Sequence, residues 1–166
     1  LAFETLAQAA KDGDPGVRQA SARALGRVPL ARARDLVYDL MKDGDGGVRV
    51  AAGETLGRLG RREGPQLLIA ELSLSNADPG QRHLAHAALR EVSGQVKELS
   101  HDMTEAAWQE AAGFWAAWLK QNDVKFQGRV STDPAAVPGA ESGGGATGST
   151  GTTGGDPVPP LPGGAE

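Results

Sequence analysis

Aspartates recur in glycine-containing turns, at a spacing that could bind a metal ion. From Asp43 to Glu54, carboxylates stand at the first, third and twelfth positions, as in the calcium loop of an EF-hand. The fifth position, however, is Gly47 rather than an oxygen ligand, and the sixth, which requires glycine, is Val48. We therefore expect no calcium site, and we interpret the matching aspartates as caps for free N–H groups at helix N-termini. These aspartates are Asp14, Asp45 and Asp78.

Two histidines could hold zinc only with help from elsewhere in the chain. His83 and His86 are three residues apart, so they share one face of a helix. Two imidazoles do not complete a tetrahedral site, and a third ligand such as His101 or Glu110 would have to come from a later segment. We expect His86 to pack against that later segment instead. The sequence predicts no bound metal and no cofactor.

Signals of catalysis are absent from the sequence. The chain has no cysteine, which excludes thiolate nucleophiles, disulfides and cysteine–zinc sites. It also lacks the nucleophile elbow G-x-S-x-G, the phosphate loop G-x-x-x-x-G-K-[ST] and the zinc motif H-E-x-x-H. We predict that the protein is not an enzyme and has no catalytic residues.

Charge is distributed unevenly along the 166 residues, which include 17 Lys and Arg and 21 Asp and Glu. All the basic residues lie within residues 1–130, and four of the acidic residues lie beyond them, so the first part is neutral. A neutral body argues against nucleic acid, whose phosphates require a basic excess. No apolar run reaches the length of a membrane span. We therefore expect neither nucleic acid nor a membrane span.

The last part of the chain, residues 131–166, has the composition of a flexible tail. It holds ten glycines and six prolines, and its large apolar residues are Val137, Val158 and Leu161. Such a segment buries too little surface to offset its conformational entropy, so we expect it to be disordered on its own. We divide the chain into a folded domain at 1–130 and a Gly/Pro/Thr-rich tail at 131–166. We expect 131–155 to act as a tether and 157–162 to dock on a partner subunit as polyproline II.

The folded domain repeats itself with a period of about thirty residues. Segments 12–18 and 43–49 share the same order of Asp, Gly, Val and Arg, with matched positions 31 residues apart. A third copy at 77–82 follows after a two-residue insertion. A fixed period of this length indicates a solenoid of stacked helix pairs. Apolar periodicity predicts helices near 2–11, 15–28, 32–43, 47–60, 65–75, 79–93 and 103–121.

The residues D-x-D-P-G-V-R-x-x-A-x-x-A-L-G at 12–26 closely resemble the HEAT-like repeat, in the short bacterial form named after phycobilisome lyases. The resemblance covers roughly residues 1–94. It implies an all-α, right-handed α-solenoid of three helical hairpins, with second helices that line a concave, macromolecule-binding side. In the third copy Gln81 replaces Val and Arg90 replaces Gly, as expected of a terminal unit.

Aromatic residues concentrate in the last expected helix. Trp108, Trp115 and Trp118 fall on one face of it. Asp102 is expected at its start and Asn122 at its end. We interpret the helix as a C-terminal cap, because the exposed end of a solenoid must be covered.

Arginines recur in two patterns. Arg18, Arg49 and Arg82 occupy equivalent positions, so we expect each to reach an acidic side chain or carbonyl of the neighbouring turn. Six other arginines follow the second helices of the first two repeats, and they could form a basic ridge that attracts an acidic partner. Alternatively, these arginines complement the negative ends of the helix dipoles at the helix C-termini. They are Arg27, Arg32, Arg34, Arg58, Arg61 and Arg62.

The repeat alignment and the aromatic helix together predict which side chains meet a partner. Equivalent solvent-facing positions on the second helices form a strip in which we expect Val50 to be an exposed apolar residue. On the aromatic helix, Phe114 and Trp118 lie at the edge of the tryptophan face, where we expect them to meet a partner. In the tail, Val158 and Leu161 are the two apolar residues that could anchor it to a partner. The predicted partner-binding residues are Gln19, Arg23, Val50, Glu54, His83, Phe114, Trp118, Val158 and Leu161.

The sequence as a whole predicts a non-enzymatic, protein-binding scaffold or accessory subunit of a larger complex. The resemblance also implies an alternative, a bilin-lyase-like accessory enzyme, although no residue of this chain supports it. The chain begins at Leu1 within an expected helix. We therefore expect a fragment or a processed product, and a regulatory segment of a longer multidomain protein is a second alternative. The compartment is left open.

Overall fold

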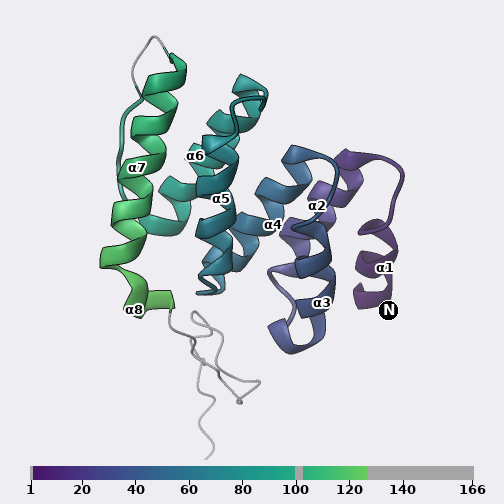
Figure 1. Ribbon diagram of the computed structural model, residues 1–166. Coiled ribbons are helices and arrows are strands. Elements are labelled where there is room, and N and C mark those ends of the chain that lie inside the picture. The colour runs from purple at the N-terminus through teal and green to yellow at the C-terminus, as the bar shows by residue number, and fades with distance from the viewer. Residues whose placement is uncertain (1, 100–102, 127–166) are drawn as a thin grey trace, which may run out of the picture. The chain divides into compact units, whose positions relative to one another are not determined.

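The computed structural model of the protein describes residues 2–99 and 103–126. Within these residues every regular element is a helix, and the sequence prediction of an all-α fold is confirmed (Figure 1). The helices are α1 Ala2–Ala9, α2 Pro15–Leu25, α3 Leu30–Leu40, α4 Gly46–Arg58, α5 Glu63–Ser73, α6 Pro79–Ser93, α7 Glu105–Gln121 and α8 Asp123–Phe126. No helix in this part of the chain is both long and apolar enough to cross a membrane.

Helices α2, α4 and α6, the second helices of the repeats, each begin directly after an aspartate that was predicted to cap them. Asp14 accepts a hydrogen bond from the Gly16 amide at 2.7 Å, and Asp45 accepts one from the Val48 amide at 3.0 Å. Asp78 caps α6 in the same way. Each cap satisfies an amide that has no partner inside its helix, which is why the chain turns at these points.

The helices stack as pairs, with α2, α4 and α6 forming one continuous row (Figure 1). The central helix of this row, α4, packs against α2 on one side and α6 on the other, and also against α5. One core cluster joins the first two pairs around Leu25, Val37 and Leu56. A second cluster joins α4, α5, α6 and α7 around Leu68 and Leu89. Helix α4 contributes buried residues to both clusters, so each pair is covered by its neighbour, as in a solenoid.

Helix α7 closes the stack with its tryptophan face. Trp108 and Trp115 are buried in the second core cluster, which is the cap role expected from the sequence. The helix begins at Glu105 with Thr104 as its N-cap, because the Thr104 side chain accepts a hydrogen bond from the Ala107 amide at 3.2 Å. The predicted initiator Asp102 lies outside the described residues. The predicted stop is confirmed, since Asn122 is the C-cap and its side chain donates to the Trp118 carbonyl.

Candidate functional site

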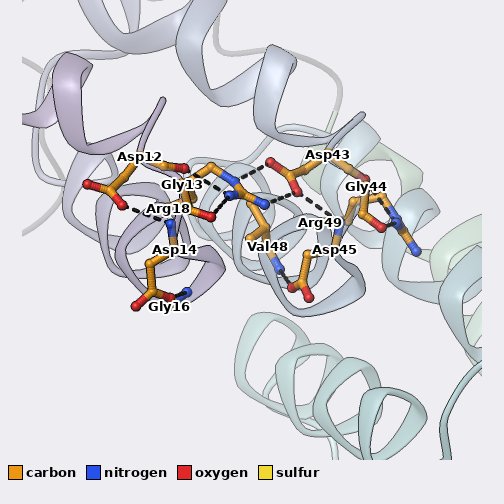
Figure 2. A network of polar contacts seen from close by, with 10 residues as sticks. All are labelled: Asp12, Gly13, Asp14, Gly16, Arg18, Asp43, Gly44, Asp45, Val48 and Arg49. Carbon is orange, nitrogen blue, oxygen red and sulfur yellow. Dashed lines mark hydrogen bonds and ion pairs between the residues drawn. The ribbon is translucent and has the colours of Figure 1, made fainter.

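The aspartates of the turns accept hydrogen bonds from backbone amides and from Arg18 (Figure 2). Arg18 donates to both carboxylate oxygens of Asp43 in the next turn, each at 2.8 Å. It also donates to the carbonyls of Asp12 and Gly13 in its own turn. The guanidinium of Arg18 holds the pKa of the Asp43 carboxyl below its ordinary value. No group of three or more metal-ligating side chains occurs among the described residues.

The predicted contact with the neighbouring turn is confirmed at Arg18, whereas the other two arginines reach acids that lie on the next helices, α5 and α7. Arg82 donates to the Leu74 carbonyl and to Glu105 of α7. Arg49 donates to both oxygens of Glu71, at 2.6 and 3.0 Å, and to carbonyls of its own turn. Glu71 is only 2% exposed and accepts a further hydrogen bond from Gln81.

Glu71 was not anticipated from the sequence. In the contact of Arg18 the acid comes from a turn, at Asp43. The third turn is two residues longer and has Asn76 at the equivalent position, so it offers no carboxylate there. The acid comes instead from α5. The signal that could have found it is an isolated acid on the apolar face of α5, beside Leu68 and Leu72.

The exposed side of the α2, α4 and α6 row, which we call the second-helix face, carries a line of alternating charges. Arg23 of α2 lies 3.5 Å from Glu54 of α4. Glu54 also pairs with Arg58 at 2.8 Å, and Arg58 lies 3.6 Å from Glu91 of α6. Arg23 and Glu54 are thus brought together as the repeat alignment implied, and the line crosses all three second helices.

Around this line the second-helix face is lined by small and apolar side chains. Leu84 of α6 is 45% exposed, and Ala20 and Ala87 are exposed on α2 and α6. A hollow of about 470 Å³ adjoins the face at the end of α6. Its lining includes Val96, which is 70% exposed. The hollow is lined by Ala87, Arg90, Glu91, Gly94, Gln95 and Val96.

The prediction that Val50 is exposed is wrong. Its side chain is 1% exposed and belongs to the second core cluster with Leu68 and Ala85. Helix α6 packs against α4 at this point, so the position is covered. The equivalent Gln19 on α2 is only partly buried, and its side-chain amide donates a hydrogen bond to the Gly47 carbonyl of α4 at 3.3 Å.

The two histidines contact the tryptophans of the cap. The exposed His83 ring lies edge-on to Trp108, with ring centroids 4.9 Å apart. His86 is buried and lies 5.7 Å from Trp115, which confirms that it packs toward α7. Its Nε2 atom is buried without a hydrogen-bond partner. Burial lowers the pKa of His86, because the protonated ring would lose its hydration.

Two residues were predicted to form an exposed aromatic edge on α7, and only one of them is exposed. Phe114 is 38% exposed, whereas Trp118 is 8% exposed, so the expectation of an exposed Trp118 is wrong. Helix α8 turns back after Asn122 and places Phe126 against Trp118, with ring centroids 5.8 Å apart. The tail residues Val158 and Leu161 lie outside the described residues.

The family model for HEAT repeats matches residues 3–90, which is more than half of the chain. The chain belongs to the HEAT repeat family. Comparison with curated proteins finds no match. HEAT repeats generally mediate protein–protein interactions, so the family supports protein partners for this chain.

In this HEAT-repeat protein the basic ridge is largely neutralised. Arg32 pairs with Glu4 at 2.9 Å, Arg61 with Glu63 at 3.3 Å, and Arg62 with Asp123 at 2.6 Å. Arg58 belongs to the charged line of the second-helix face. These pairs favour the structural interpretation of the arginines over a surface that attracts an acidic partner.

Proposed function

We propose that this HEAT-repeat protein is a non-enzymatic scaffold that binds another protein through its second-helix face. The observation that carries the proposal is the charged line of Arg23, Glu54, Arg58 and Glu91, which runs across three helices. A surface of this extent suits a macromolecule rather than a small ligand.

The chemistry of the face supports protein as the partner. The line holds two arginines and two glutamates, so its net charge is zero, and it offers no excess of positive charge to a phosphate backbone. Leu84 and Val96 are exposed apolar side chains near one end of the line, and the hollow beside Val96 is also lined by the polar residues Arg90, Glu91 and Gln95. Apolar side chains surrounded by polar groups are the usual composition of a protein interface.

The finer proposal is that the protein is an accessory subunit of a larger complex. The neutral helical body and the Gly/Pro-rich composition of residues 131–166 support it. Docking by Val158 and Leu161 stays a prediction. Native-state sizing of the endogenous protein checks this proposal: a particle much larger than the chain is expected, and a particle of the chain's own mass contradicts it.

The binding face is tested by placing a large charged side chain on it. Ala87→Arg adds bulk to an exposed position of α6, and Ala70→Arg makes the same change at an exposed position of α5, outside the second-helix face. Both variants are expected to keep the circular dichroism of the parent protein. Quantitative mass spectrometry of tagged protein from its native cells should identify partners that Ala87→Arg loses and Ala70→Arg retains. Equal recovery with both variants would contradict the proposed face.

A further inference from the structure

Helix α7 has an outward face that is unusual for the end of a solenoid. The tryptophan face points into the stack, and the opposite face is exposed. Terminal elements of repeat proteins normally present polar outer faces, because no further repeat covers them. Here the middle of the outward face is formed by Gly113, Ala116 and Ala117, with Phe114 38% exposed at its edge. We call this surface the α7 outer face.

No close contact among the described residues requires a glycine at position 113. A Cβ atom added there would meet no atom within 4 Å. Glycine is less favourable than alanine inside a helix, because it loses more backbone entropy on folding. Its backbone conformation is helical, not left-handed. A glycine of this kind allows a close approach by another helix, in a pair formed by residues four apart, Gly113 and Ala117.

The charges on the α7 outer face indicate which helix would fit. Glu110 lies one turn before the small residues and Lys120 one turn after them. The Glu110 carboxylate is 76% exposed, and only one of its oxygens contacts Lys97, at 3.3 Å. Lys120 is exposed and has no ion pair among the described residues. The face is therefore acidic at one end, small in the middle and basic at the other end.

We propose that the α7 outer face binds a second copy of this chain, as an antiparallel helix pair. In a twofold arrangement centred at the level of Trp115, residues equally distant from that level face each other. Glu110 then faces Lys120 of the second copy, and Gly113 faces Ala117 of the second copy. The Glu110–Lys120 ion pair and the Gly113–Ala117 contact each occur twice because of the symmetry. A parallel arrangement would instead place like charges together.

The expected dimer is weak and separate from the second-helix face. One helix from each copy buries an area at the small end of specific interfaces, which bury about 1,200–2,000 Å² in total. We therefore expect a dimer that dissociates on dilution through the micromolar range. Because the two faces lie on different helices, failure of the dimer and failure of partner binding are distinguishable.

Sedimentation equilibrium of the full chain over the micromolar range tests the proposal. The parent protein should show a monomer–dimer equilibrium. Lys120→Glu should weaken dimerisation by about tenfold, because it replaces two attractive pairs by two repulsive ones. Glu110→Lys should do the same, and the double variant Glu110→Lys/Lys120→Glu should restore the parent affinity. Ala117→Arg should abolish the dimer, because it places a large side chain where the two helices approach each other closely.

Controls separate this contact from other association and from misfolding. Ala70→Arg, on α5, should leave the dimer unchanged, and circular dichroism should be the same for all variants. A monomer at the highest concentration reached would overturn the proposal. So would a dimer that survives Ala117→Arg, or a double variant that is no better than the single variants.

Discussion

At the residue scale, the most demanding contact of the body is the one between Arg49 and Glu71. The Glu71 side chain is 3% exposed and the Arg49 side chain 21%, so neither charge is fully hydrated. An acid in this position is tolerated because it accepts hydrogen bonds from Arg49 and Gln81. The pair of Arg23 and Glu54 meets no comparable requirement, because the Arg23 side chain is 47% exposed and Glu54 has Arg58 as a second partner.

Removing the arginine alone should therefore destabilise the protein strongly. We expect Arg49→Met to lower the free energy of unfolding by about 3 kcal/mol, because it leaves a buried carboxylate without its counter-charge. Arg23→Met should change it by less than about 1 kcal/mol, because that arginine is half exposed. Urea unfolding followed by circular dichroism measures both values. The double variant Arg49→Met/Glu71→Leu should recover part of the loss, and strict additivity would contradict the account.

His86 should make the stability of the cap depend on pH. Its pKa is lowered in the folded state by burial, so below about pH 6.5, the ordinary value of histidine, the unfolded chain binds more protons. Stability should therefore fall as the pH decreases from 7 toward 5. Acids with a lowered pKa, such as Asp43, act in a lower window, because their contribution is lost only as the pH falls below about 4.

A variant that cannot titrate at this position isolates the effect. His86→Phe keeps a ring against Trp115 and removes the ionisation. Thermal unfolding at pH 7 and pH 5 should show a smaller difference between the two pH values for this variant than for the parent. An equal difference in both proteins would assign the acid sensitivity to other groups.

At the scale of the helix, two glycines show that the cost of adding a side chain depends on what packs against the helix. Gly113 of α7 has open space where a Cβ would stand. Gly64 of α5 is buried, and a Cβ there would overlap the backbone of Gly53 and Gly57 in α4. Helices α4 and α5 can pack this closely only because these positions lack side chains.

The same substitution should thus have opposite effects in the two helices. Gly113→Ala should raise the free energy of unfolding of the dilute monomer by about 0.5–1 kcal/mol, through helix propensity alone. Gly64→Ala should lower it by about 1–3 kcal/mol, because α4 and α5 must move apart. Chemical denaturation at low protein concentration gives both numbers. A loss of stability in Gly113→Ala would mean that the α7 outer face is covered within the monomer.

Helix positions could be predicted from the sequence because their starting signals are local. Asp78 followed by Pro79 defines the start of α6, and the observed bounds 79–93 are the predicted ones. The burial of Val50 could not be predicted, because the repeat equates it with Gln19 and does not specify what packs above each position. The packing of α8 over Trp118 could not be predicted either, because the sequence does not specify the turn after Asn122 that brings Phe126 against that ring.

At the scale of the whole molecule, the folded body depends on the cap. Among the described residues, the buried members of the two core clusters lie between Ala10 and Phe126. Trp115 is fully buried against the last repeat, so the second cluster loses its cover if α7 is removed. The folded body should therefore tolerate truncation only beyond α8.

Two truncations test this dependence. Deleting residues 131–166 should leave the helical signal and the melting temperature of the body nearly unchanged. Deleting residues 100–166 should lower the melting temperature by more than about 10 °C, since the loss of three buried tryptophans costs several kcal/mol. Circular dichroism melts of the two proteins give the answer. Unfolding of the first truncated protein would show that the tail belongs to the fold.

The central claim is that this HEAT-repeat protein binds a protein partner on its second-helix face, and site-specific photo-crosslinking tests it most directly. A photoreactive amino acid would replace Ala20 of α2 or Ala87 of α6 on that face, and Ala31 of α3 or Ala70 of α5 elsewhere; all four positions are exposed. In the native cells, positions 20 and 87 are predicted to cross-link the same protein, while 31 and 70 yield none of it. Cross-links to a common partner from positions 31 and 70 alone would contradict the account.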